Sequence, residues 1–388
     1  MTGPEATDPN LPRHLHIIQT LDINRSGGLV SVKLVHESML RCGIESVLVF
    51  NQTSRAVEIP PGSIAVTPLA GNRFYFGLRT AAIIREQVAG VDAVHVHGLY
   101  TYLNLVAGQC CRRLGKALVY HPHGTLAPAY LRRGRLKKQC VLWAFENANF
   151  RNVAAWRALS EVEAGQIRAA VPGANVIVVP NGVAMPAEAS APTVAEFRPG
   201  INMRAGCRRF LFLSRVAAVK GVDLLVSAWL AAGKQLNNCE LWIAGPDFDG
   251  SAYTAEERLR AAGCRNVFVL GAVTDREKDW LFRSADVFVL PSRGEGQSSA
   301  ILEAMAYGTP VLLTTTCYFP LAAQLGAGLE CEPNEPAIRQ SLVAFGTSGD
   351  SELEEMGSRG RELVREHYNI DQVARSLDHG IAQILKRT

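Results

Sequence analysis

Residues 286–314 constrain the fold of this chain more than any other stretch. The apolar, β-branched run at 286–292 predicts a buried strand, and the run at 310–314 predicts a second one. A glycine-containing loop and a helix-forming segment at 298–307 lie between them. This order predicts a βαβ unit, and ligands of such sheets bind beyond the carboxyl ends of the strands.

Two glutamates occupy that binding edge. Glu295 lies in the glycine loop, and Glu303 lies about one turn into the predicted helix. An ionised carboxylate accepts several hydrogen bonds, which suits it to the hydroxyl groups of a sugar or a ribose. The segment therefore predicts a site for a hydroxyl-rich ligand. The alternative is a helix capped by Ser298 or Ser299, with two solvated glutamates.

The same alternation of strands and helices recurs along the chain. In the first half, strands are predicted at 14–20, 46–50, 93–97, 117–120, 153–159 and 176–179, and helices at 29–42, 76–89, 100–114, 135–150 and 161–170. In the second half, strands are predicted at 210–213, 240–244, 266–270, 287–290 and 311–313, and helices at 221–232, 253–262, 274–284, 298–307, 335–346, 350–367 and 370–386. This spacing predicts an α/β protein with two Rossmann-like, doubly wound domains facing a cleft.

The domain boundaries follow from length and composition. At 388 residues the chain is long for one domain, and the stretch at 184–198 contains Pro, Ala and Ser without periodicity, which is typical of a linker. We therefore expect an N-terminal domain at 1–185 and a C-terminal domain at 186–369. The helical segment at 370–388 follows the second domain.

Composition also bears on where the protein works. No run approaches about 18 consecutive apolar residues, so no transmembrane helix is expected. The first ten residues lack the basic and apolar regions of a secretory signal. The nine cysteines are scattered and form no metal-binding pattern, as is typical of free thiols in a reducing cytoplasm.

Charge is distributed unevenly. Residues 1–185 carry 19 Lys and Arg against 11 Asp and Glu, whereas residues 186–388 carry 21 against 25. A basic tract in the first half contains Arg132, Arg133, Arg135, Lys137 and Lys138. It predicts contact with an anionic membrane surface or a lipid-linked diphosphate, the alternative being solvated charge. Nucleic acid is not expected, because the tract lacks interleaved aromatic residues.

A second loop in the C-terminal half predicts an anion site. Arg215 and Lys220 follow the predicted strand at 210–213, and Lys220-Gly221 precedes a predicted helix. Two cations beside the N–H groups of a helix start suit a diphosphate. The alternative is an ordinary surface Arg and Lys after a strand.

These motifs together resemble a known family. The pattern E-G-x-x-x-x-x-L-E-A-M-A-x-G-T-P-V at 295–311 is similar to the donor-binding signature of the family 4 retaining glycosyltransferases, which have the two-domain GT-B fold. The family pattern S/G-R-x-x-x-x-K-G is matched at Ser214, Arg215, Lys220 and Gly221. In the GT-B fold the final helix crosses back to the N-terminal domain, which implies this position for 370–386.

The resemblance implies roles for the site residues. Glu295 contacts the donor sugar, Glu303 contacts the nucleotide ribose, and Arg215 and Lys220 neutralise the diphosphate as it leaves. The donor-binding set is completed by Gly27, Gly28, Gly296, Gln297, Ser298 and Ser299. The family often has Phe-Gly where this chain has Gln297 and Ser298, near the sugar, so the resemblance does not fix the identity of the donor.

Histidines mark the ends of two predicted strands in the first half. His95 and His97 belong to one strand end, and His121 and His123 to the next. His123 before Gly124 matches the position of a family histidine that contacts the donor sugar near the reacting carbon, and His121 is a supporting residue. Four histidines also suggest zinc, but no acidic residue lies near them, so we expect no metal.

The sequence therefore predicts a retaining, metal-independent glycosyltransferase without a cofactor, in which His123, Arg215, Lys220 and Glu295 are the catalytic residues. The predicted donor is a UDP-sugar or GDP-mannose, and the predicted acceptor is a glycan or lipid-linked glycan in polysaccharide biosynthesis. The predicted location is the cytoplasm, peripheral to the inner face of the membrane. The alternatives are a non-catalytic nucleotide-sugar-binding protein and a sugar-nucleotide epimerase of the same fold. A dehydrogenase is disfavoured, because no complete G-x-G-x-x-G follows a first strand.

Overall fold

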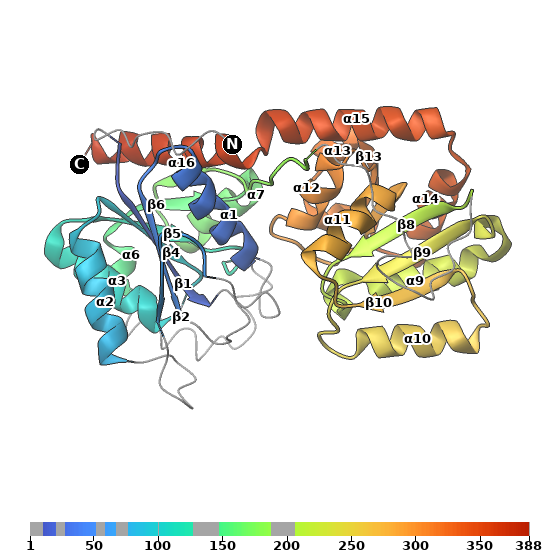
Figure 1. Cartoon of the computed structure of the whole chain (residues 1–388), viewed down its shortest axis with the longest axis horizontal. Helices are drawn as coiled ribbons and strands as arrows, with labels where there is room; N and C mark the ends of the chain where they lie inside the picture. The colour runs from blue at the N-terminus through green and yellow to red at the C-terminus, as the bar shows by residue number, and fades with distance from the viewer. Residues whose placement is uncertain are drawn as a thin grey trace. The chain divides into compact units, whose positions relative to one another are not determined.

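The structure is a computed structural model that describes residues 11–20, 28–51, 59–66, 77–99, 101–126, 147–187 and 206–387 (Figure 1). The chain divides into two compact units. Unit 1 comprises Met1–Gly182 and Ile370–Thr388, and unit 2 comprises Val183–Asn369. The chain leaves unit 1 and returns to it at neighbouring points, since a Cβ atom on Gly182 would lie 2.7 Å from the Cα atom of Ile370.

Unit 1 is built on a seven-stranded parallel sheet in the order β3-β2-β1-β4-β5-β6-β7. Its strands are β1 (His14–Thr20), β2 (Ser46–Asn51), β3 (Ser63–Val66), β4 (Ala93–His97), β5 (Ala117–His121), β6 (Val153–Ala158) and β7 (Val176–Val178). Its helices are α1 (Gly28–Arg41), α2 (Leu78–Ala89), α3 (Tyr102–Leu114), α6 (Asn147–Phe150), α7 (Glu161–Ala170) and α16 (Ile370–Leu385). The order of strands reverses between β1 and β4, where ligands of such sheets bind.

Helix α16 is part of the core of unit 1. Asp371 accepts hydrogen bonds from Ser38 Oγ at 2.6 Å and from Arg41 Nη2 at 2.8 Å, which join α16 to α1. Beneath these contacts lies an apolar cluster drawn from α1, α16 and the sheet, with Val35, Met39, Ala93, Val119, Ala155, Ile370, Val373 and Leu377 among its buried members. Burying each large aliphatic side chain is worth about 1.5–3 kcal/mol, so this helix adds substantially to the stability of the unit.

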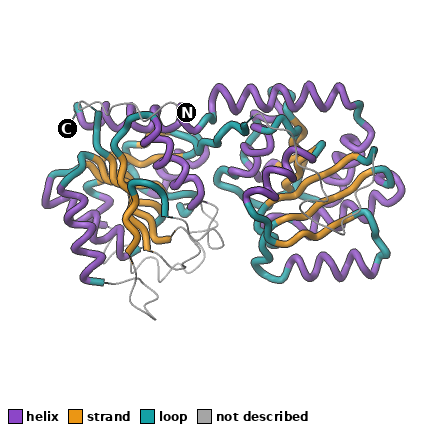
Figure 2. Tube along the Cα trace, viewed as in Figure 1, coloured by secondary structure: helices purple, strands orange, loops and turns teal. Residues whose placement is uncertain are grey.

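Unit 2 is built on a six-stranded parallel sheet in the order β10-β9-β8-β11-β12-β13. Its strands are β8 (Arg208–Leu213), β9 (Cys239–Ala244), β10 (Val267–Gly271), β11 (Val287–Leu290), β12 (Val311–Thr314) and β13 (Gly328–Cys331). Its helices are α9 (Val222–Ala232), α10 (Ser251–Ala261), α11 (Asp275–Ser284), α12 (Ser299–Ala306), α13 (Leu321–Gln324), α14 (Glu335–Thr347) and α15 (Asp350–His367). Figure 2 shows helices around the strands of each unit.

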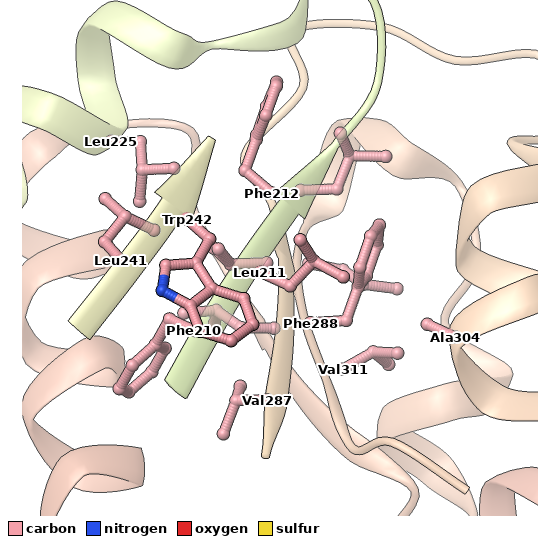
Figure 3. Packing of buried hydrophobic residues seen from close by; sticks show 14 of the residues in the cluster. Phe210, Leu211, Phe212, Leu225, Leu241, Trp242, Val287, Phe288, Ala304 and Val311 are labelled. Atoms are coloured by element: carbon pink, nitrogen blue, oxygen red, sulfur yellow. The ribbon is translucent and has the colours of Figure 1, made fainter. Parts of the chain in front are cut away.

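The core of unit 2 explains why its strands are apolar along their whole length. Phe210, Leu211 and Phe212 follow one another along β8 and are all fully buried (Figure 3). Successive side chains of a strand point to opposite faces, so both faces of this sheet are covered. On one face Trp242 of β9 stacks on Trp280 of α11, with ring centres 5.3 Å apart.

The predicted architecture is confirmed: two parallel-sheet, Rossmann-like domains. The elements that the sequence did not predict are short, namely β3, β13 and α13. The predicted linker at 184–198 is described only as far as residue 187, and the predicted helix at 135–150 only from Asn147. The remainder of both segments lies outside the described residues. Within the described ranges, no helix has both the length and the apolar character of a membrane span.

Candidate active site

One candidate site lies where the strand order of the unit 2 sheet reverses, between β8 and β11. Strand β8 has β9 on one side and β11 on the other, so the loops after β8 and β11 leave neighbouring strands at the same edge. The first loop carries Arg215 and Lys220, and the second carries Glu295. The parallel topology thus brings the predicted diphosphate and sugar residues to one edge of this sheet.

Lys220 and Glu295 join these two loops. Lys220 Nζ donates to both carboxylate oxygens of Glu295, at 2.6 and 2.7 Å. The side chains are only 12% and 7% exposed, so water screens little of their attraction. The backbone N–H of Glu295 donates to the carbonyl of Thr316 at 3.1 Å, which fixes the loop below the pair. Removing one partner would leave the other charge buried and uncompensated.

The two loops also lie backbone against backbone. Gly221 has φ +74°, and a Cβ atom there would lie 1.9 Å from the carbonyl oxygen of Pro291, so only glycine fits. The carbonyl of Val219 accepts from Arg293 N at 2.8 Å and from Ser292 Oγ at 3.1 Å. These contacts hold the cation-bearing loop in a fixed position relative to the glycine loop.

Arg215 has a different neighbour from Lys220. Its guanidinium carbon lies 4.9 Å from the ring centre of Phe248, a cation–π contact. Phe248 is 56% exposed and belongs to the loop after β9, where its backbone N–H donates to the carbonyl of Val216 at 3.0 Å. One loop therefore carries two cations, one held by a carboxylate and one by an aromatic ring.

Glu303 is held by a lysine that the sequence analysis did not predict. It is the fifth residue of α12, and its Oε1 accepts from Lys278 Nζ of α11 at 2.8 Å. The Glu303 side chain is 14% exposed and that of Lys278 is 29% exposed. No motif in the sequence pairs them, because the contact depends on how α11 and α12 pack. Both glutamates of the predicted donor site thus have a lysine counterion.

The start of α12 offers further hydrogen-bond donors. Gly296 and Gln297 precede it, Ser298 occupies its N-cap position, and Ser299 is its first residue. The Ser298 side chain makes no capping hydrogen bond, contrary to the helix-cap alternative. The first N–H groups of α12 are therefore not satisfied by that side chain, and such groups suit ligand oxygens.

Six of the nine histidines of the chain gather in unit 1, on β1, β4, β5 and the loop after β5. They form two hydrogen-bonded rows on the face of the sheet that α1 and α16 cover. The first histidine row consists of His14, His95 and His121, and the second histidine row consists of His16, His97 and His123. Within each row the nitrogen–nitrogen distances are 2.9–3.0 Å.

The first histidine row runs between two charged side chains. His14 Nε2 lies 2.9 Å from Asp378 Oδ1 of α16, and His14 Nδ1 lies 2.9 Å from His95 Nε2. His95 Nδ1 lies 2.9 Å from His121 Nε2, and His121 Nδ1 faces Arg157 Nη1 at 3.4 Å. Every ring nitrogen of this row has a partner.

The second histidine row ends at the predicted site residue His123. His16 Nδ1 lies 3.0 Å from His97 Nε2, and His97 Nδ1 lies 3.0 Å from His123 Nε2. The two outer nitrogens, His16 Nε2 and His123 Nδ1, are buried without a hydrogen-bond partner among the described residues. His123 also has φ +51°, a backbone conformation that is uncommon outside glycine and concentrates at functional sites.

Glu163 and Arg157 hold this edge together, and the sequence analysis predicted neither. Glu163 Oε1 accepts from the N–H of Gly124 at 2.6 Å, and its Oε2 accepts from the N–H of Leu159 at 2.7 Å, so it fastens the His123 loop to the loop before α7. Arg157 donates to two backbone carbonyls, those of Val179 at 2.9 Å and Pro180 at 2.5 Å. The sequence did contain one signal for Arg157, namely its position inside the otherwise apolar strand predicted at 153–159.

Burial keeps five of these histidines neutral, namely His16, His95, His97, His121 and His123. It lowers the pKa of His16, His95, His97 and His121 well below the usual 6.5, and neighbouring histidines and the Arg157 cation lower them further. The pKa of His123 falls to about 3, from burial first and then from Arg157. Arg157 itself has a pKa lowered by burial to about 10 and stays charged. At neutral pH the rows therefore act through hydrogen bonds rather than charge.

Nitrogen atoms of His97, His121 and His123 lie within 4.8 Å of one another, close enough to suggest a metal site. Two observations argue against a metal ion at this position. Every ring nitrogen of these three residues except His123 Nδ1 already has a hydrogen-bond partner, and the Arg157 guanidinium, 3.4 Å from His121 Nδ1, repels a cation. A metal-free site therefore stays our expectation. Of the predicted glycines, Gly28 begins α1, while Gly27 and the basic tract at 132–138 lie outside the described residues.

Two family models match this chain. Residues 207–344 match the model for "Glycosyl transferases group 1", and residues 27–182 match the model for a "Glycosyl transferase 4-like domain". The matched segments cover both sheets and well over half of the chain. The chain belongs to the group 1 glycosyltransferases. The predicted resemblance is thereby confirmed.

Individual relatives match this chain at sequence identities between 28% and 35%. The D-inositol 3-phosphate glycosyltransferase of Segniliparus rotundus is 28% identical over 72% of this chain and 65% of its own length. The phosphatidyl-myo-inositol mannosyltransferase of Mycobacterium leprae is 31% identical over half of each chain. The mannosylfructose-phosphate synthase of Agrobacterium fabrum is 35% identical over 27% of this chain and 24% of its own length. The chain thus spans less than two thirds of the length of each of these relatives.

Solved structures confirm the GT-B fold. Sucrose-phosphate synthase from Thermosynechococcus elongatus superposes with a TM-score of 0.74 at 18% identity, covering 97% of this chain and all of that one. Anabaena HepE, solved with UDP and glucose, superposes with a TM-score of 0.76 at 14% identity, covering 96% of this chain and all of that one. At these identities the likeness concerns the fold alone.

Proposed function

We propose that this protein transfers a sugar from a nucleotide-sugar donor to an acceptor hydroxyl with retention of the anomeric configuration. The observation that carries the proposal is the Lys220–Glu295 pair, because the lysine that we expect to bind the diphosphate and the glutamate that we expect to bind the sugar lie in contact, at 2.6 and 2.7 Å. Family membership and the UDP bound to Anabaena HepE support the donor class. The donor is expected to be a UDP-sugar or GDP-mannose.

Binding of the donor would redistribute the two ion pairs. Lys220 and Arg215 neutralise the diphosphate, so Lys220 exchanges part of its contact with Glu295 for phosphate oxygens. Glu295 then accepts from sugar hydroxyls. Glu303 keeps its hydrogen bond from Lys278 on one carboxylate oxygen and accepts a hydrogen bond from the ribose on the other, since a carboxylate can accept several hydrogen bonds.

The chemistry follows from this distribution of charge. As the glycosidic bond breaks, negative charge grows on the diphosphate, and cations fixed beforehand stabilise it more than they stabilise the ground state. The acceptor hydroxyl attacks from the face that the diphosphate leaves, and a phosphate oxygen takes its proton. No carboxylate serves as nucleophile and no metal is required in this scheme.

Unit 1 is assigned to the acceptor and unit 2 to the donor, except that His123 of unit 1 is expected to contact the donor sugar, as the family resemblance implies. A glycan or lipid-linked glycan acceptor at the inner face of the membrane is favoured by the basic first half of the chain, and by one relative whose name includes phosphatidyl-myo-inositol. Binding to anionic vesicles at low salt, lost at high salt, would support this location. Absence of binding at low salt would favour a soluble acceptor.

The first experiment is a thermal-shift screen of nucleoside diphosphates, followed by incubation with the matching nucleotide-sugars and NMR analysis of the products. We expect one diphosphate to stabilise the protein, and the released or transferred sugar to keep its anomeric configuration initially. Activity should be unchanged by EDTA. Epimerised nucleotide-sugar would favour the epimerase alternative, and binding without any turnover would favour the non-catalytic one.

A further inference from the structure

The two histidine rows differ in what fixes the positions of their hydrogens. In the first histidine row both ends are fixed, because Arg157 can only donate and the carboxylate of Asp378 accepts. With one hydrogen on each ring, a single arrangement satisfies every contact of the row. Arg157 donates to His121 Nδ1, and each ring donates from Nε2 to the next, as far as Asp378. All three rings of this row therefore carry hydrogen on Nε2.

No charged group determines the direction of the second histidine row. Its three neutral rings make two internal hydrogen bonds, which leaves one N–H and one lone pair at the ends. The two ends are His16 Nε2 and His123 Nδ1. Both nitrogens are buried, but His16 lies completely inside the sheet, whereas the rest of His123 is partly exposed at the edge of the sheet, where a ligand can reach it. An unpaired N–H in the interior is rarer and more costly than an unpaired lone pair. The hydrogen therefore belongs at the His123 end.

We propose that His16 and His97 are positioning residues that hold the ring of His123 with its hydrogen on Nδ1, so that His123 donates a hydrogen bond from Nδ1 to a hydroxyl or phosphate oxygen of the ligand. In this arrangement His16 donates from Nδ1 to His97 Nε2, and His97 donates from Nδ1 to His123 Nε2. Only the identity of the ligand rests on the proposed function. The assignment of the hydrogens rests on the geometry of the rows.

Two further contacts support a ligand-directed role for His123. Its left-handed backbone conformation is maintained by neighbouring hydrogen bonds, from Gly124 N to Glu163 and from Thr125 Oγ1 to the carbonyl of Pro122 at 2.7 Å. A strained residue held in place from both sides, with one unpaired polar atom, is typical of a binding site. The hydrogen bond between His97 and His123 in the second histidine row additionally fixes the plane of the His123 ring.

The assignment of hydrogens can be tested without any ligand. Long-range proton–nitrogen correlation spectra of protein labelled with ¹⁵N-histidine distinguish the two neutral forms of each ring. We expect hydrogen on Nδ1 in His16, His97 and His123, and on Nε2 in His14, His95 and His121. His36 is an internal reference, because its Nε2 lies 2.7 Å from the carbonyl of Pro61, which can only accept. Hydrogen on Nε2 of His123 would overturn the proposal whatever the protein does.

The positioning role is tested by two substitutions of one residue and a matched control. His97→Leu removes the donor to His123 Nε2, and should raise the KM for the nucleotide-sugar about tenfold. His97→Asn keeps an N–H near the position of Nδ1, and should restore most of the loss. The control is His95→Leu, which lies two residues earlier on β4, stacks on the His16 ring and forms its hydrogen bonds with His14 and His121 instead. It should lower the melting temperature but leave KM within about twofold of wild type.

The outcomes separate the two proposals. If no nucleotide-sugar is turned over, the proposed function fails, and the spectra still decide the position of the hydrogens. If turnover is found and the two His97 variants change KM equally, or no more than His95→Leu does, the positioning role fails. Variants that do not fold leave the decision to the spectrum of the wild-type protein.

Discussion

The two candidate sites use opposite kinds of polar chemistry at equivalent places. In unit 2 the site lies where the strand order of the parallel sheet reverses, between β8 and β11. In unit 1 it extends from the equivalent reversal, between β1 and β4, to His123 in the loop after the neighbouring strand β5. Unit 2 holds its site with ion pairs, Lys220–Glu295 and Lys278–Glu303. Unit 1 holds its site with neutral imidazoles, of which His123 reaches the edge. Topology therefore determines where a site lies, and the residues there determine its chemistry.

The difference matters because the two kinds of contact respond differently to a ligand. An ion pair carries charge that an incoming diphosphate can compete for, so its members are expected to change partners during catalysis. A row of neutral rings has nothing to exchange with a charged group, and is suited to keeping a donor at a fixed position. The comparison leads to four predictions, in order of decreasing effect.

Mild acid should destabilise unit 1 before unit 2. The pKa of five of its histidines is lower in the folded chain than the unfolded value of 6.5, so the unfolded state binds more protons. Stability is thus fully present above pH 6.5 and falls below it, by at most about 1.4 kcal/mol per pH unit for each histidine. Hydrogen exchange followed from pH 7.5 to 5 should show this loss in β1, β4 and β5.

The carboxylates of unit 2 provide the contrast. Hydrogen bonds from Arg293 and Arg283 lower the pKa of Asp223 and Asp279, so the stability they add is lost only at pH values near and below their ordinary 3.8. Equal loss of protection in β8 and β11 between pH 6.5 and 5 would contradict the predicted order.

Removal of the diphosphate cations should have the next largest effect. Lys220→Ala and Arg215→Ala are each expected to reduce turnover about 10²-fold or more, since each charge-assisted contact is worth about 1.5–3 kcal/mol and acts on the leaving group. Lys220→Ala should also lower stability, because Glu295 stays buried without its partner. Arg260→Gln is the control, because Arg260 is exposed and pairs with its helix neighbour Glu257. Turnover near that of wild type in both alanine variants would exclude this role.

The two glutamates should separate by ligand. Glu303→Ala should weaken binding of the free nucleoside diphosphate about tenfold, because its carboxylate is expected to accept from the ribose. Glu295→Ala should affect the intact nucleotide-sugar and largely spare the free diphosphate. Calorimetry with both ligands measures the difference, and the reverse order would show that the two roles are exchanged.

The smallest effect is expected at the lysine that the sequence did not reveal. Lys278→Met keeps much of the side-chain volume but removes the donor to Glu303, and should weaken diphosphate binding about two- to fivefold. The loss should vanish with a 2′,3′-dideoxy nucleotide, which has no ribose hydroxyls for Glu303 to bind. A loss of the same size with both nucleotides would place Lys278 against the phosphates instead.

The sequence predicted what depends on local pattern. The long apolar strands and the helices with clear ends lie within a few residues of their predicted bounds, as for 370–386 and α16. Strands β3 and β13 were not predicted, because four residues such as Ser63–Val66 carry too little periodicity. The loops of Arg215, Lys220 and Glu295 could be placed at one edge, because each directly follows a strand of a parallel sheet.

The remaining contacts depend on register and on distant segments. His16 lies opposite His95 only because β1 and β4 pair with that register, and no sequence pattern fixes it. Asp378 is 364 residues from His14 along the chain, and Glu163 is 39 residues from Gly124. The sequence identified the four histidines at strand ends, but not the two on β1 that complete the rows.

The discontinuity of unit 1 has a consequence for how the protein is made. Unit 2 is one continuous segment, and it can close its core as soon as that segment has left the ribosome. Unit 1 begins first but lacks α16, and with it Asp378 and one wall of its apolar cluster, until after unit 2 has been translated. Unit 1 is therefore expected to be synthesised first but to complete its fold last. Until α16 has been made, one face of its sheet, formed by strands β1 to β7, stays incompletely covered.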